Sequence, residues 1–182
     1  MHKRLIEVNL IMNKISCLTL IWLFCLNIPV FAATEKVVLH NNKFGGITKL
    51  VTYFNENEYN KDGIQKIIYH YDNRGHEKLV EIFATNDYST KVGLYKTLIY
   101  YKEKGRIIEI FSTDIQAAEK GYFKLVLHLS DSNKLEKQEY YFTEKSPIAM
   151  LGIYKRVIYY DSSGEIKRVI HLDKVGNIAM IE

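Results

Sequence analysis

Lysine, tyrosine and histidine recur at a fixed spacing in this sequence, and together these side chains could contact anions and stack on flat ligands. In six segments a lysine is followed two residues later by an aliphatic residue, and two residues after that by tyrosine or histidine. The lysines are Lys49, Lys66, Lys96, Lys124, Lys155 and Lys167, and the final positions are Tyr53, His70, Tyr100, His128, Tyr159 and His171. Ammonium groups and aromatic rings in this arrangement suit glycans, anionic lipid headgroups or the acidic surface of a partner.

Because successive strand residues point to opposite faces, residues that are two positions apart lie on the same face of a strand. Each Lys–aliphatic–Tyr/His set therefore shares one face. The opposite face is mainly apolar and ends in Phe54, Tyr71, Tyr101, Leu129, Tyr160 and Leu172. Ordinary packing explains the same pattern, since tyrosine pairs well across strands and lysine is common at sheet edges. We therefore carry two interpretations of the Lys–aliphatic–Tyr/His face, a binding surface and a packed, solvated surface.

Metal binding and catalysis find little support in the residue pattern. His70, His128 and His171 occupy equivalent positions, but the repeated strands are expected to be second neighbours, roughly 9–10 Å apart. That separation is too large for one ion bound at ~2.1 Å. Asp72 and Asp161 fall at the starts of turns, where aspartate stabilises the local backbone. No Gly-x-Ser-x-Gly elbow is present, so we expect no metal, no cofactor and no catalytic residues.

The composition fits one folded domain with no nucleic-acid partner. The chain has 182 residues and a formal net charge of +4. Lys3, Arg4 and Lys14 against Glu7 account for half of that excess, and the remaining charges are of mixed sign along the chain. Nucleic-acid binding needs a concentrated basic face, which this distribution does not predict.

The N-terminal segment has the order of a secretory signal. Lys14 precedes a largely apolar run over 15–31, and Val30-Phe31-Ala32 supplies small residues where signal peptidase requires them. We expect residues 1–32 to be a signal peptide and 33–182 to be a single β-repeat domain, periplasmic or extracellular; an uncleaved membrane anchor is the alternative. Both cysteines, Cys17 and Cys25, lie in the segment that cleavage removes.

A repeat of about 30 residues runs through the rest of the chain. Segments 65–75, 95–105, 123–133 and 154–164 each combine a β-branched and aromatic run with a polar turn that ends in Gly or Asn. Such segments favour β-hairpins. Connectors of equal length at 84–93, 112–121 and 143–152 end in Gly and are interpreted mainly as loops. The sequence predicts an all-β antiparallel meander of about ten or eleven strands, either an open curved sheet or a closed or sandwiched one.

Two of these turns carry a recognisable phrase. The runs Tyr69-His70-Tyr71-Asp72-Asn73-Arg74-Gly75 and Tyr159-Tyr160-Asp161-Ser162-Ser163-Gly164-Glu165-Ile166 resemble the YD repeat of RHS-type proteins and the shorter repeats of bacterial MORN-like proteins. The resemblance covers some 8–10 residues in each repeat. It implies β-hairpin strips that serve as shells, carbohydrate-binding surfaces or interaction scaffolds.

These observations predict an exported, non-catalytic β-repeat protein that binds or scaffolds through its Lys–aliphatic–Tyr/His face. Suitable partners are a glycan, a lipid or a protein of the cell envelope. Three alternatives remain at this point. One is a small outer-membrane β-barrel, which tight turns on one side and longer connectors on the other would suit. The others are a soluble carrier of lipid or another apolar ligand, and an enzyme with an unrecognised site.

Overall fold

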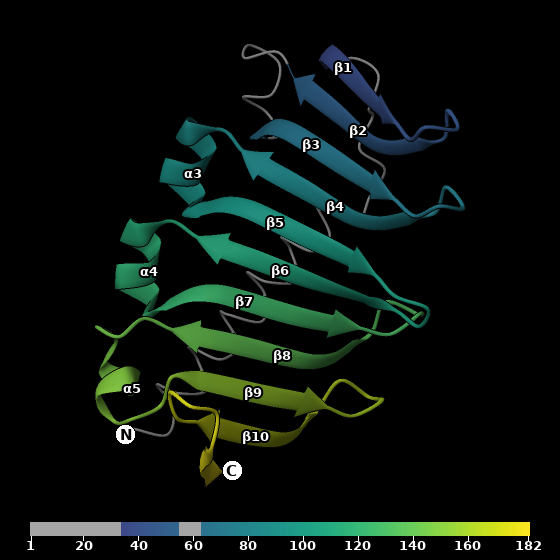
Figure 1. The fold of residues 1–182 in the computed structure, drawn as a ribbon. Coiled ribbons are helices and arrows are strands. Elements are labelled where there is room, and N and C mark those ends of the chain that lie inside the picture. The colour runs from purple at the N-terminus through teal and green to yellow at the C-terminus, as the bar shows by residue number, and fades with distance from the viewer. Residues whose placement is uncertain (1–33, 55–62) are drawn as a thin grey trace. The chain divides into compact units, whose positions relative to one another are not determined.

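The computed structural model describes residues 34–54 and 63–182, which belong to one compact unit, Ala33–Glu182. The predicted signal peptide, residues 1–32, lies outside the described residues. The described part of the chain is dominated by one antiparallel sheet with short helices along one edge (Figure 1).

The sheet contains eleven strands whose spatial order is their order along the chain. They are β1 (Thr34–Asn41), β2 (Ile47–Phe54), β3 (Ile64–Tyr71), β4 (Glu77–Ala84), β5 (Leu94–Tyr101), β6 (Arg106–Ser112), β7 (Tyr122–Leu129), β8 (Leu135–Phe142), β9 (Lys155–Tyr160), β10 (Ile166–Leu172) and β11 (Ile178–Ile181). β1 and β11 are the two edges, so the sheet is open. The prediction of an all-β antiparallel meander is confirmed.

The tight turns that join the two strands of each hairpin lie along one side of the sheet. In most of these turns one polar side chain accepts hydrogen bonds from the turn backbone. In the turn between β3 and β4, the Asp72 carboxylate accepts hydrogen bonds from the backbone N–H groups of Arg74 (2.8 Å) and His76 (2.9 Å). These bonds, led by the one from His76, hold the pKa of Asp72 below its ordinary value. Gly75 completes the turn in the left-handed region, at φ +82°. Asp161 makes the same pair of bonds between β9 and β10, as its predicted place at a turn start requires.

Short helices form the opposite edge, where the sequence predicted mainly loops. They are α3 (Asn86–Val92), α4 (Asp114–Lys120) and α5 (Pro147–Met150). Each begins after a hydroxyl residue whose side chain accepts a backbone N–H bond, namely Thr85, Thr113 and Ser146. The loop interpretation was wrong because these N-caps, with glycines ending α3 and α4, stabilise helices of only one or two turns.

The connectors also bind one another along this edge. The backbone N–H of Thr85 donates to the carbonyl of Gly63 at 2.9 Å, and that of Thr113 donates to Gly93 at 2.8 Å. The third such bond, from Thr143 to Gly121, is 2.9 Å long. Contact is close enough that a Cβ added at Gly93 would lie 2.1 Å from Cγ of Gln116. Successive repeats are therefore held at a fixed interval at the helix edge as well as through the strands.

Buried aliphatic residues lie on both faces of the sheet. On the face that carries the lysines, Val51, Ile68, Val126, Val157 and Ile170 are at most 8 % exposed. The more apolar face contributes residues of β3 to β7 and of β9 that are at most 9 % exposed: Ile67, Ile82, Ile99, Ile108, Ile110, Leu125, Leu127 and Ile158. Isoleucine and leucine alternate here with residues of the other face, as half-buried strands require. The strand register places the lysines of β3, β5, β7 and β9 on one face and these aliphatic residues on the other.

Candidate functional site

Ten of the twelve predicted site residues share one face of the sheet, which we call the ladder face. The strand register places Lys49 opposite His70, and Tyr53 opposite Lys66. It continues through the intervening strands to the remaining members, which are Lys96, Tyr100, Lys124, His128, Lys155 and Tyr159. As predicted, β3, β5, β7 and β9 are second neighbours, because a hairpin partner separates each pair.

Aromatic rings stand between the lysines in one row across seven strands. The row runs Lys66, Phe83, Lys96, Phe111, Lys124, Tyr141 and Lys155, each residue directly opposite the next. Nζ of Lys66 lies 4.3 Å from the centre of the Phe83 ring, and Nζ of Lys96 lies 4.8 Å from the same ring. Tyr141 likewise lies between Lys124 at 4.3 Å and Lys155 at 4.7 Å. These are cation–π distances, so this row of rings is part of the ladder face.

Lys49 does not belong to this row. β2 runs antiparallel to β3, so Lys49 lies opposite His70, at the end of the face near the turns, while Tyr53 takes the position beside Lys66. The prediction treated β2 as another copy of the repeated strand. Because β2 is the second strand of its hairpin, the frame it shares with β3 runs in the reverse direction.

The prediction that Lys167 and His171 share the ladder face is wrong. The pairing of β10 with β9 shifts by one residue between Ile166 and Arg168, so that Lys167 has no direct partner on β9. After this shift His171 lies opposite Arg156, on the apolar face. His171 is only 1 % exposed, and its Nε2 lies 3.3 Å from Oε1 of Glu182. Burial, with the positive charge of Arg156 as the next cause, lowers the pKa of His171. The ladder face of β10 carries Arg168, Ile170 and Leu172 instead.

Glutamates at the middle of β4, β6 and β8 partner the lysines of the row. Glu81 lies between Ile68 and Leu98, and its two oxygens reach Lys96 Nζ at 2.7 Å and His70 Nε2 at 2.8 Å. Burial alone would raise the pKa of Glu81, but the hydrogen bonds from Lys96 and His70 outweigh it and leave that pKa below its ordinary value. The carboxylate thus binds one residue from each neighbouring strand.

Glu139 is the most strongly held of the three glutamates. Its side chain, 8 % exposed, lies 3.0 Å from His128 Nε2, 2.8 Å from Lys137 Nζ and 2.7 Å from Lys155 Nζ. The Tyr141 hydroxyl donates a fourth contact at 2.8 Å. The hydrogen bond from His128, supported by those from Lys137, Lys155 and Tyr141, lowers the pKa of Glu139 far below its ordinary value despite burial. Burial lowers the pKa of Lys155, but the bonds to Glu139 and Tyr141 reverse this and raise it overall.

Glu109 occupies the equivalent position on β6 and, among the residues that the structure describes, has one ion-pair partner at a longer distance. Lys124 Nζ lies 3.6 Å from its carboxylate. The other nearby cations contact its neighbours instead, since Lys96 binds Glu81 and His128 binds Glu139. Three lysines of the row are therefore neutralised within the sheet, which argues against a surface of free cations.

The sequence contained a signal for these glutamates and rings. Glu81-x-Phe83, Glu109-x-Phe111 and Glu139-x-Tyr141 repeat at nearly the spacing of the lysines. The second strand of each hairpin thus carries a carboxylate and an aromatic residue on the face where the first strand carries lysine. Pairing the two strand patterns, rather than following the first strand alone, would have revealed the ladder.

Irregular pairing at the helix end of β3, β5 and β7 adds a further row of side chains. The register shifts between Ile64 and Lys66, between Leu94 and Lys96, and between Tyr122 and Lys124. The extra residues are Gln65, Tyr95 and Phe123, and a bulge of this kind re-aims a side chain. Tyr95 is 45 % exposed and its ring lies 6.1 Å from that of Phe111; Phe123 is 44 % exposed and 6.3 Å from Tyr141. Exposed rings therefore border the lysine row.

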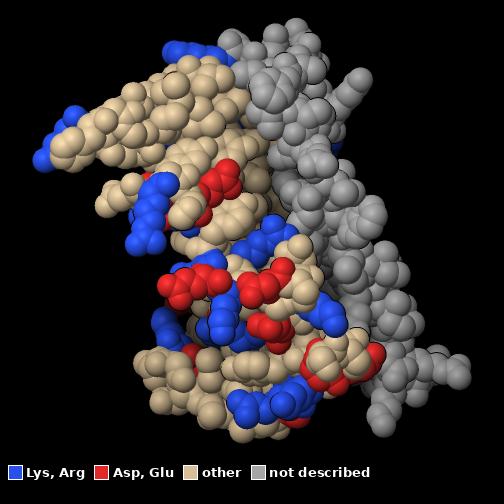
Figure 2. Space-filling model, turned by 90° about the vertical axis from the view of Figure 1, so that its right-hand side faces the viewer, with Lys and Arg blue, Asp and Glu red and all other residues tan. Residues whose placement is uncertain are grey.

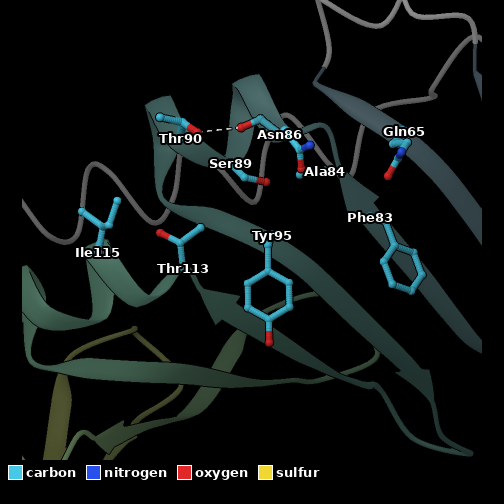
Figure 3. A pocket seen from close by; sticks show the side chains of 9 residues that line it. All are labelled: Gln65, Phe83, Ala84, Asn86, Ser89, Thr90, Tyr95, Thr113 and Ile115. Carbon is cyan, nitrogen blue, oxygen red and sulfur yellow. Dashed lines mark hydrogen bonds between the residues drawn. The ribbon is translucent and has the colours of Figure 1, made fainter.

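A shallow pocket of about 430 Å³ opens where these bulges meet the helix edge. Figure 3 shows its side chains coming from β3, from the end of β4, from α3 with the start of β5, and from the start of α4. Its lining residues are Gln65, Phe83, Ala84, Asn86, Ser89, Thr90, Tyr95, Thr113 and Ile115. None of them is charged, unlike the row of lysines beside it.

Charges of both signs intermingle elsewhere on the described residues. Seen from the turn edge, lysine and arginine side chains alternate with aspartate and glutamate (Figure 2). Among the described residues, no group of three or more His, Cys, Asp or Glu could hold a metal ion. The helices within the described ranges are too short or too polar to span a membrane.

No protein-family model matches this chain, and no curated protein matches it. Functional inference therefore depends on the ladder face and the pocket beside it.

Proposed function

We propose that this chain is an exported, non-catalytic binding module that contacts a glycan through the ladder face. The observation that carries the proposal is the pair of exposed rings, Tyr95 and Phe123, at equivalent bulges of successive repeats. β5 and β7 are second neighbours, so the backbones that carry the two rings are about 9–10 Å apart across the sheet. A linear polymer of sugar rings could stack on both at once.

The surroundings of these rings favour a polar, largely uncharged ligand. Lys96 and Lys124 stand beside them but are engaged by Glu81 and Glu109. A strongly anionic ligand would have to displace those carboxylates, whereas a glycan needs only ring faces and hydrogen-bonding groups. Aromatic rings suit this task because they combine a large apolar face with a polar rim. Lipid headgroups and envelope proteins are the competing ligands, and the test below includes an anionic lipid surface.

Affinity electrophoresis in gels containing neutral and acidic polysaccharides tests the proposal. The wild-type protein should be retarded by at least one glycan, and Tyr95→Ala combined with Phe123→Ala should weaken binding about tenfold or more, because two stacking contacts are lost. Phe44→Ala is the matched control, since Phe44 is an exposed aromatic residue (84 %) in the distant turn between β1 and β2. Retardation that is equal for both variants, or binding only to anionic vesicles, would overturn the glycan assignment.

Export is tested separately. Cell fractionation of the tagged full-length protein, with mass spectrometry of its N-terminus, should give a form that begins near Ala33 outside the cytoplasm. An intact N-terminus in the membrane fraction would instead support the anchor alternative. A cytoplasmic protein that begins at Met1 would contradict export.

A further inference from the structure

We propose that the pocket between α3 and the bulge of β5 is a subsite for a single neutral sugar unit or a disaccharide. The inference deepens the proposed glycan-binding function and depends on it. The volume of the pocket, about 430 Å³, lies within the range of small-molecule sites, roughly 300–1,000 Å³. The question is which chemical groups the pocket presents and which ligand would satisfy them.

Tyr95 is the stacking platform of this pocket. Phe83, the other aromatic residue of the lining, has Lys66 and Lys96 over its ring at 4.3 and 4.8 Å, so part of its face is already in use. The Tyr95 ring is 45 % exposed, and Phe111 supports it from the sheet at 6.1 Å. Figure 3 shows the Tyr95 ring extending from the start of β5 in the direction away from the side chains of α3. One ring face in a concave site is the feature that pyranose rings use for stacking.

Amide and hydroxyl groups line the side of the pocket nearer to α3 (Figure 3). Gln65 comes from the bulge of β3, Asn86 from the first turn of α3, and Ser89 from the next turn (Figure 3). Within the described part of the chain, no hydrogen bond occupies the side-chain amide of Gln65 or Asn86. The Thr90 hydroxyl, by contrast, donates to the backbone carbonyl of Asn86 at 2.8 Å. Free amides offer both donors and acceptors, which matches the hydroxyl groups of a sugar.

The position of these groups is set by the backbone rather than by the ligand. The Thr85 side chain accepts the N–H of Tyr88 and fixes the start of α3, and Gly93 ends the helix in the left-handed region at φ +78°. The bond from Thr113 to the Gly93 carbonyl then attaches α4 to α3. A pocket formed before the ligand arrives loses less entropy on binding.

Charge decides the class of ligand. No Asp, Glu, Lys or Arg lines the pocket. A carboxylated or sulfated sugar would find no cation in the pocket, and an amino sugar with a free ammonium would find no carboxylate. A neutral saccharide, including an N-acetylated one, leaves no charge without a partner. The pocket and the lysine row thus differ in the ligands that they suit.

Saturation-transfer NMR and titration calorimetry with the exported protein test the subsite, using cellobiose, maltose, chitobiose and a glucuronic-acid disaccharide as probes. At least one neutral disaccharide should bind, with the glucuronic-acid probe at least tenfold weaker. Asn86→Ala and Gln65→Ala should each weaken that binding about tenfold, since each removes hydrogen bonds to the ligand. Asn73→Ala, an exposed asparagine in a turn, is the matched control, and circular dichroism should show every variant folded.

The outcomes separate this inference from the proposed function. If polysaccharide retardation depends on Phe123 but no neutral disaccharide is affected by Asn86→Ala or Gln65→Ala, the subsite is refuted and the glycan-binding face survives. Preference for the glucuronic-acid probe also refutes the neutral subsite. If neither polysaccharide nor disaccharide binds, the proposed function fails and the subsite fails with it.

Discussion

Glu139 and Glu109 occupy the same place in neighbouring repeats, yet within residues 34–54 and 63–182 Glu139 has three cationic partners and Glu109 has one. Glu139 on β8 has contacts of 2.7–3.0 Å with Lys155, Lys137 and His128. Glu109 on β6 has Lys124 at 3.6 Å. Their strand environments are otherwise alike, because each lies between aliphatic residues of the flanking strands.

The difference in ion pairing between Glu139 and Glu109 has two causes, which are shared cationic partners and one position where the two strands carry different residues. Both strands beside β6 also lie next to another glutamate strand: Lys96 on β5 contacts Glu81, and His128 on β7 contacts Glu139. In addition, β8 carries Lys137 where β6 carries Ile107. A repeated backbone therefore does not repeat its electrostatics. A ladder of alternating charges divides its partners unequally, and the sites with fewest ion pairs remain the most available to a ligand.

Removing the charge of Glu139 should have the largest effect on stability. Glu139→Gln leaves two lysines and a histidine around an uncharged amide in a position only 8 % exposed. We expect the free energy of unfolding to fall by about 3 kcal/mol, the usual cost of breaking a buried pair. Urea denaturation followed by circular dichroism measures it. Glu109→Gln should change the same quantity by less than about 1 kcal/mol, and equal losses in the two variants would remove the distinction between the sites.

Acid should erase the effect of Glu139→Gln. The pKa of Glu139 lies below its ordinary value of 4.5 in the folded protein. The resulting stabilisation is complete above about pH 4.5 and is lost as the pH falls toward the folded pKa. Urea midpoints of wild type and variant should therefore differ most at neutral pH and converge below pH 4.5. A difference that persists unchanged at pH 3 would show that packing, not charge, makes Glu139 important.

Lys137→Ile makes the surroundings of Glu139 resemble those of Glu109. One of three cationic contacts is lost, while His128 and Lys155 remain. The expected loss is about 1 kcal/mol in the free energy of unfolding, because Lys137 is partly exposed and its attraction is screened. Lys145→Ile, at an exposed connector position, is the control. A loss as large as that of Glu139→Gln would mean that Lys137 alone holds the carboxylate.

The reverse exchange, Ile107→Lys, should have the smallest effect. It places a cation two residues before Glu109, as Lys137 stands before Glu139. Stability should change by only a few tenths of a kcal/mol, since the new ion pair offsets the lost packing of a half-buried isoleucine. A double-mutant cycle of Ile107→Lys with Glu109→Gln should nevertheless show a favourable coupling of about 0.5 kcal/mol. Zero coupling would indicate that the added lysine turns toward solvent.

Most of the fold could be read from local sequence. The repeated hairpins, their turn glycines and the equal connectors follow from strand alternation and turn chemistry, both of which act within a few residues. The helices α3, α4 and α5 were harder to predict because each is only four to seven residues long. Such helices depend on caps such as Thr85 and on contacts between connectors, including the bond from Thr113 to Gly93.

The ladder face was only half predictable for a different reason. The face of a strand residue depends on register, and one extra residue reverses it. The bulge at Lys167 therefore moved His171 to the apolar face although its spacing from Lys167 matched the other copies. Contacts such as Glu81 to Lys96 depend on which strands pair. The repeated pattern of the first strand shows the lysines but not the glutamates that contact them from the neighbouring strands.

The strand order of the sheet has a consequence for how the chain folds. Every strand pairs only with strands adjacent to it in the chain. Pairings between sequence neighbours require short loops to close, and topologies of this kind fold quickly for their size. A chain that emerges from a narrow pore from its N-terminus can complete each hairpin before the next appears, and each finished hairpin offers its edge as a template for the following strand. Addition or loss of one whole repeat would leave the remaining pairings intact, so the length of such a protein can change by units during evolution without a new fold.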